Sequence, residues 1–164
     1  MSEIDVRRAV RQSIQTEKNA MDFYRLGAGM MKNPEAKRVF NLLAGEEKVH
    51  ASQFYKVYTG TDIPDFEAYM ARPVDNEASW IVALQKVIDS EFTEQKAMEL
   101  AMEKELGLEK ALRETAARIA DPEVRAVYEL NARETHHHYE LIESEYARIM
   151  GMVHESDMDI YVRE

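Results

Sequence analysis

Apolar residues recur every three or four positions along four stretches of the chain, which is the spacing of one buried face of an α-helix. These stretches cover residues 6–28, 40–57, 80–101 and 127–141. Glycine and proline are scarce, with six and four residues among 164. The pattern predicts an all-α protein built from four long amphipathic helices.

Local signals predict where these helices begin and end. Ser2 and Asp5 form a capping box for the first helix. Asn33-Pro34-Glu35 and Asp121-Pro122-Glu123 each combine a capping residue with proline at the first helical position, so they begin the second and fourth helices. We expect Gly60 to end the second helix and Gly151 to end the fourth.

The two remaining segments connect helices or interrupt one. Residues 61–76 contain Pro64 and Pro73 and are too long for a tight turn, so they predict a crossover. Phe66, Tyr69 and Met70 are expected to hold this crossover against the helices. Gly107 is expected to break the third helix, leaving residues 108–120 as an extra segment.

An internal repeat relates the two halves of the chain. Thr16-Glu17 recurs as Thr93-Glu94, and Glu47-x-x-His50 recurs as Glu134-x-x-His137 with a slip of one residue. Two helical hairpins joined by a long connection predict an antiparallel four-helix bundle of the single-crossover type. We expect this bundle to span residues 1–151, followed by a C-terminal tail over 152–164.

Composition narrows the classes of protein that fit. A net charge of −10 without a basic cluster argues against a nucleic-acid partner or an anionic membrane surface. The absence of cysteine excludes disulfides, thiolate nucleophiles and iron–sulfur clusters. No stretch without charged residues is long enough to span a bilayer, and the first residues lack the apolar core of a signal peptide. We therefore expect a cytoplasmic protein.

Titratable side chains interrupt all four apolar faces, and this pattern carries the functional prediction. They are Glu17, Glu47, His50, Glu91, Glu94, Glu134 and His137. Burying five carboxylates without compensation is prohibitively costly, and no lysine or arginine accompanies them on these faces. Two divalent or trivalent cations would balance the charge, as in carboxylate-bridged di-metal bundles. Oxygen and imidazole ligands without thiolate favour iron first and manganese second, although zinc could occupy the same site.

The motifs resemble the di-iron domain of the rubrerythrins, in the ferritin-like superfamily, over about residues 5–150. The resemblance implies that Glu47 and Glu134 bridge two iron ions, with Glu17 and Glu94 as terminal ligands and one imidazole, His50 or His137, on each metal. Rubrerythrins carry an additional glutamate three residues before the third-helix ligand, and Glu91 matches it by position. The resemblance implies that Glu91 and His50 exchange as ligands when the metal pair changes oxidation state. Tyr24 resembles the tyrosine that donates a hydrogen bond to a ligand.

One departure shapes the functional expectation. Rubrerythrins commonly carry a cysteine-ligated rubredoxin module, for which this chain has neither the cysteines nor the length, so we expect a separate electron donor protein. The resemblance implies reduction of hydrogen peroxide by a diferrous centre, in a role against oxidative stress. The alternative is a ferroxidase that handles iron and reacts with oxygen. A metal-free interaction protein and a manganese catalase-like activity also remain open, and a homodimer is expected.

Some neighbours of the motifs have an ordinary explanation. His136 and His138 flank His137 and are expected on the surface. Glu46 precedes Glu47 and is expected either on the surface or in support of a ligand.

Overall fold

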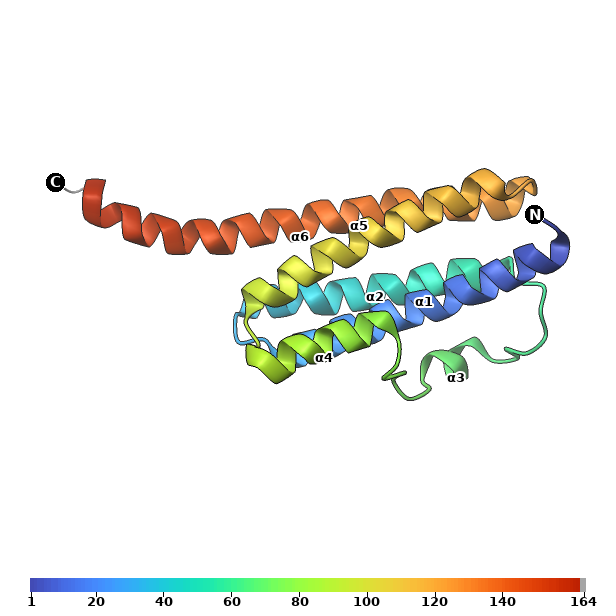
Figure 1. The fold of residues 1–164 in the computed structure, drawn as a ribbon, viewed down its shortest axis with the longest axis horizontal. Coiled ribbons are helices and arrows are strands. Elements are labelled where there is room, and N and C mark those ends of the chain that lie inside the picture. The colour runs from blue at the N-terminus through green and yellow to red at the C-terminus, as the bar shows by residue number, and fades with distance from the viewer. Residues whose placement is uncertain (163–164) are drawn as a thin grey trace.

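A computed structural model describes the backbone of residues 1–162 and the side chains of residues 1–3 and 5–151. Along residues 1–162, six helices follow one another: α1 (Glu3–Met30), α2 (Pro34–Lys56), α3 (Phe66–Met70), α4 (Ser79–Glu91), α5 (Glu94–Arg118) and α6 (Pro122–Val162). Helices α1, α2, α5 and α6 form two antiparallel hairpins that lie against each other, with α4 on the side of α1 (Figure 1). The expected all-α bundle of ferritin-like type is confirmed, and the described residues contain no strand.

The first hairpin forms as its capping signals predict. The Ser2 hydroxyl accepts a hydrogen bond from Asp5 N, and the Asp5 carboxylate bonds back to the Ser2 amide, which completes the capping box. Asn33 caps α2 by accepting from the backbone amides of Glu35 and Ala36. The apolar faces of both helices are buried, including Ile14, which has no exposed surface. Helix α2 ends at Lys56 rather than at Gly60.

The crossover runs from the end of α2 to the start of α5, along the length of the bundle (Figure 1). It contains α3 and α4, and Tyr69 and Met70 are buried as expected, while the Phe66 ring lies 5.2 Å from that of Tyr55. Trp80 on α4 packs edge-on against Phe23 of α1, with ring centroids 5.2 Å apart. These contacts hold the crossover against the first hairpin, and α5 then pairs with α6.

The third helix is broken at a different place from the one predicted. The break lies at Phe92 and Thr93, where Thr93 accepts a hydrogen bond from Lys96 N and caps a new helix. Helix α5 then continues through Gly107. Helix α6 likewise continues through Gly151 to Val162, beyond the end of the bundle (Figure 1), so that glycine does not end it. A single glycine inside a helix costs only about 1 kcal/mol relative to alanine, which a long helix can absorb.

The core lies between the hairpins and runs along their whole length. It is mainly aliphatic and aromatic, with Tyr24 in edge-to-face contact with both Phe23 and Phe40. Several charged side chains are buried at its middle. Lys18 and Asp22 form an ion pair within α1 at 2.6 Å, and the others form the site described below. Within the described part of the chain, no helix combines the length and the apolar composition needed to cross a membrane.

Candidate metal centre

The first hairpin brings Glu17 of α1 together with Glu47 and His50 of α2. All three side chains are at most 1% exposed. His50 Nδ1 lies 3.7 Å from a Glu17 oxygen and 3.9 Å from a Glu47 oxygen. Glu47 and His50 are three residues apart, so they project from the same face of α2 about one turn apart. These three predicted residues are found together as expected.

The second hairpin contributes His138 where His137 was expected. His138 is 5% exposed, and its Nδ1 lies 2.8 Å from Glu47 Oε1. His137 is exposed and lines the surface cavity beside the site. The buried face of α6 passes through Tyr128, Thr135 and His138, one residue away from the predicted face. Because two adjacent helical faces share the same spacing, periodicity alone did not distinguish them.

Tyr128 helps to set the rotation of α6. Its ring packs against Phe54 with centroids 4.8 Å apart, and its hydroxyl forms a 2.7 Å hydrogen bond with the Ser13 hydroxyl. Burial of this large side chain turns Glu134 to the rim of the site, where its side chain is 36% exposed. Glu134 therefore lies beside the cluster, on the cavity side, and not in its buried centre.

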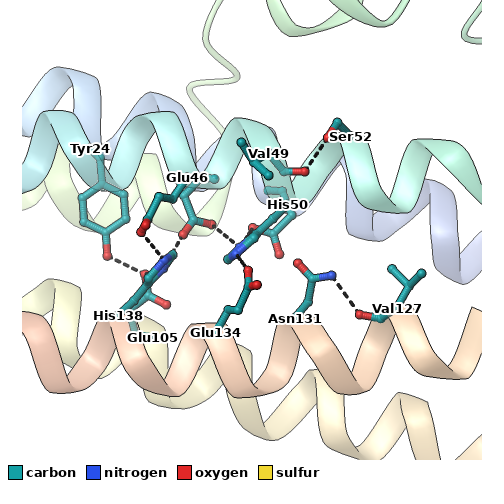
Figure 2. A network of polar contacts seen from close by, with 12 residues as sticks. Tyr24, Glu46, Val49, His50, Ser52, Glu105, Val127, Asn131, Glu134 and His138 are labelled. Carbon is teal, nitrogen blue, oxygen red and sulfur yellow. Dashed lines mark hydrogen bonds and ion pairs between the residues drawn. The ribbon is translucent and has the colours of Figure 1, made fainter.

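Glu105 of α5 occupies the place that Glu94 was expected to fill. Glu105 has no exposed surface, and its Oε1 lies 3.8 Å from His138 Nδ1. Tyr24 donates a 2.6 Å hydrogen bond to the same Oε1 (Figure 2). The hydrogen bond expected from Tyr24 to a buried carboxylate is thus present, and its acceptor is Glu105.

Glu91 and Glu94 do not join this cluster. Glu91 is the exposed last residue of α4. Glu94 is the first residue of α5, and its carboxylate accepts hydrogen bonds from the backbone amides of Lys32 (2.6 Å) and Asn33 (2.9 Å). Burial alone would raise the pKa of Glu94, but these two hydrogen bonds outweigh it and lower the pKa. Glu94 thus joins the start of α5 to the turn between α1 and α2.

The residues that come together in the cluster are related by an internal repeat with one constant offset. Each member of the second hairpin lies 88 positions after its counterpart: Glu105 after Glu17, His138 after His50 and Glu134 after Glu46. The helix starts at Asn33 and Asp121 have the same offset. Keeping the register of these two helix starts would have identified Glu105 and His138 from the sequence. The similarity of Thr16-Glu17 to Thr93-Glu94 instead aligned Glu17 with Glu94, which does not lie in the cluster.

The two imidazoles are held by crossed contacts between the hairpins. His50 Nε2 lies 2.5 Å from a Glu134 oxygen, and His138 Nε2 lies 2.8 Å from a Glu46 oxygen (Figure 2). The two rings are stacked, with centroids 5.0 Å apart and an interplanar angle of 13°. Each histidine therefore turns Nε2 toward a carboxylate of the other hairpin and Nδ1 toward the buried glutamates. A carboxylate on the outer nitrogen is the usual way in which a metal-binding histidine is oriented.

The cluster places several carboxylates together away from water, where they cannot all stay ionised without positive charge nearby. Burial, together with the charges of Glu17 and Glu105, raises the pKa of Glu47 well above its usual range. Burial disfavours the charged form of His138, yet the carboxylates of Glu105, Glu46 and Glu47 outweigh it and raise its pKa to about 12. Protons on these groups balance the charge, and a metal cation could take their place.

The atoms that a metal would need are the ones left without partners. Although His138 Nδ1 and Glu47 Oε1 are 2.8 Å apart, they lack the alignment of a hydrogen bond. The buried atoms without a hydrogen-bond partner include Glu17 Oε1 and Oε2, Glu47 Oε1 and Oε2, His50 Nδ1, Glu105 Oε2 and His138 Nδ1. Glu47, His50 and His138 also place one ligand atom each within 4.8 Å of the others. Because buried polar atoms are normally satisfied, this donor set fits bound metal ions.

The comparisons with known proteins agree with this geometry. The family model of rubrerythrin matches residues 9–146, which is most of the chain. The chain belongs to the rubrerythrin family. No curated protein and no solved structure gives a match. Family membership implies a di-iron centre of ferritin-like type, and the buried carboxylate and imidazole groups fit it.

A cavity of about 460 Å³ connects the site to the surface between α2 and α6. Its lining includes both histidines of the cluster and the two carboxylates that contact them, Glu46 and Glu134. Small molecules and cations can therefore approach the imidazole side of the site without opening the bundle.

Proposed function

We propose that this rubrerythrin-family protein is a di-iron oxidoreductase whose central reaction is the oxidation of ferrous iron held between the two hairpins. The observation that carries the proposal is the convergence of Glu17, Glu47, His50, Glu105 and His138 with their ligand atoms free of other partners. Three carboxylates and two imidazoles are hard and intermediate ligands, which suit iron or manganese; zinc fits as well but has no redox chemistry.

Each hairpin would supply one half of the centre. Glu17 and His50 Nδ1 would hold one iron, Glu105 and His138 Nδ1 would hold the other, and Glu47 would contact both. A bound ferrous pair supplies two electrons and Lewis acidity to a small oxidant.

The surrounding residues position these groups. Tyr24 orients Glu105 through its hydrogen bond. Glu134 and Glu46 accept from Nε2–H of the two imidazoles and so direct Nδ1 inward.

The ferroxidase-type activity is favoured over peroxide reduction. The expectation of a peroxidase depended on a second carboxylate three residues before the third-helix ligand. With Glu105 in the ligand position, that residue is Met102, and Glu91 lies exposed at the end of α4. A thioether cannot replace a carboxylate that exchanges with His50. Peroxide reduction is retained as the second candidate, because the family supports it and because the cavity admits a small oxidant.

The partners belong to the same proposal. Repeated turnover needs an electron source, and we assign this role to a separate electron donor protein. A homodimer in the cytoplasm, without nucleic acid or membrane, completes the proposal.

Anaerobic loading with ferrous iron tests the function. We expect two iron ions per chain by elemental analysis, followed by diferric absorption that forms faster with oxygen than with peroxide. Faster reaction with peroxide would instead support the second candidate. A folded protein that retains no iron, cobalt or manganese would contradict the proposal. The double variant Glu17→Gln, His138→Ala serves as the unloaded control.

A further inference from the structure

The repeat that builds the centre is broken at one ligand position. Counting 88 positions from Glu47 leads to Thr135, whereas its neighbours Glu134 and His138 keep the residue types of Glu46 and His50. Both Glu47 and Thr135 have no exposed surface, so the two side chains face the interior from equivalent turns of α2 and α6. The second hairpin thus carries a hydroxyl where the first carries its central carboxylate.

The polar atoms near this position lack partners. Among the residues that the structure describes, Thr135 Oγ1 has no hydrogen-bond partner, although threonines in helices commonly donate to the carbonyl four residues earlier. One turn before it, Asn131 donates from Nδ2 to Val127 O at 2.8 Å, which leaves its buried Oδ1 unpartnered (Figure 2). The counterpart of Asn131 in the first hairpin is Leu43. This part of α6 therefore offers hydrogen-bonding atoms that the fold itself does not use.

The charge of the proposed centre also calls for one more anion. Glu17, Glu47 and Glu105 supply three negative charges, whereas two ferrous ions supply four positive charges. A glutamate at position 135 would make the buried centre neutral. Glu46 and Glu134 lie on the outer side of the imidazoles and are 46% and 36% exposed, so that water screens them.

We propose that Thr135 keeps the place of a second bridging carboxylate open for a small monovalent anion from solution, such as azide, formate or acetate. The Thr135 hydroxyl would donate a hydrogen bond to this anion. The cavity between α2 and α6 is lined by His50 and His138 and not by Thr135, so the anion would enter past the two imidazoles. This inference rests on the proposed function, because the anion needs the two metal ions as its main partners.

Azide titration of the iron-loaded, oxidised protein tests the inference, since azide bound to ferric iron gives its own charge-transfer absorption. We expect Thr135→Glu to weaken azide binding at least 100-fold, because its carboxylate occupies the open place. Thr135→Val keeps the shape and removes the hydroxyl, so it should weaken azide by about 5- to 10-fold, the value of one hydrogen bond. Thr115→Val is the matched control, because Thr115 bonds only its own helix, and it should leave azide binding unchanged.

Iron content, measured before azide is added, separates the two proposals. Wild-type protein without iron would overturn the proposed function. Two iron ions per chain with equal azide affinity in wild type and Thr135→Glu would overturn this inference alone. Stronger azide binding in Glu134→Gln, with no effect of Thr135→Val, would also overturn it, because Glu134 would then occupy the place. If Thr135→Glu does not fold, Thr135→Val still decides.

Discussion

The α1–α2 and α5–α6 hairpins share one scaffold, but their central residues differ. Both begin their second helix with a capped proline, both place a glutamate 30 positions before the central residue of that helix, and both carry a histidine three positions after it. They differ at Glu47 and Thr135, and at Tyr24 and Leu112. The comparison indicates that the shared residues supply a matched set of ligands and contacts from each half, whereas the differing residues distinguish one half from the other.

The largest expected effect distinguishes His138 from its neighbour. His138→Ala should lower metal affinity at least 100-fold, as should His50→Ala, because each removes one Nδ1 ligand from the buried cluster. His137→Ala should change the affinity by less than threefold, since that side chain is exposed. Competition with a metal-binding dye measures all three. Equal losses in His137→Ala and His138→Ala would contradict the buried face assigned to α6.

A second prediction separates the two candidate carboxylates of the third helix. Glu105→Ala should reduce the metal content to one ion or none. Glu94→Ala should keep both ions but lower the free energy of unfolding by about 1–3 kcal/mol, because it removes two charge-assisted bonds to backbone amides. Elemental analysis and urea unfolding of both variants give the result. Loss of metal only in Glu94→Ala would restore the register that the sequence first indicated.

The crossed contacts predict a symmetric effect of smaller size. Glu46→Gln and Glu134→Gln should each weaken metal binding by about 10- to 100-fold, because each removes the carboxylate that orients an imidazole of the opposite hairpin. Glu140→Gln is a control on α6, since the ion pair that Glu140 forms is with the half-buried His136 outside the cluster, at 3.6 Å. Calorimetric titration with cobalt measures the affinities. An effect confined to one of the two glutamates would show that the hairpins are not equivalent in this respect.

The smallest expected effect concerns Tyr24, which has no counterpart in the second hairpin. Tyr24→Phe should weaken metal binding by only a few-fold, because Glu105 keeps its place but loses the hydrogen bond that orients it. The reciprocal change Leu112→Tyr serves as a contrast, since it adds a hydroxyl to the other side of the repeat. Cobalt titration of both proteins is sufficient. A complete loss of metal in Tyr24→Phe would mean that Tyr24 is itself a ligand.

Much of this fold follows from the sequence because helix caps and apolar spacing are local signals. Ser2, Asn33 and the buried faces of α1 and α2 could all be assigned from neighbouring residues. The rotation of α6 could not be assigned in this way, because Val127 and Tyr128 both begin plausible faces. The contacts of Tyr128 with Phe54 and Ser13 on the first hairpin distinguish them. Glu94 was misassigned because a glutamate after a capping threonine looks the same whether it faces the bundle or begins a helix.

A symmetric pair of identical hairpins could not have built this site. In such a pair, positions 47 and 135 would be the same residue, and any change that removed one central carboxylate would remove both. Joining the hairpins through α3 and α4 in one chain lets one half keep Glu47 while the other carries Thr135. Because the crossover keeps both hairpins in one chain, a residue on one side of the centre can change without changing its counterpart on the other side.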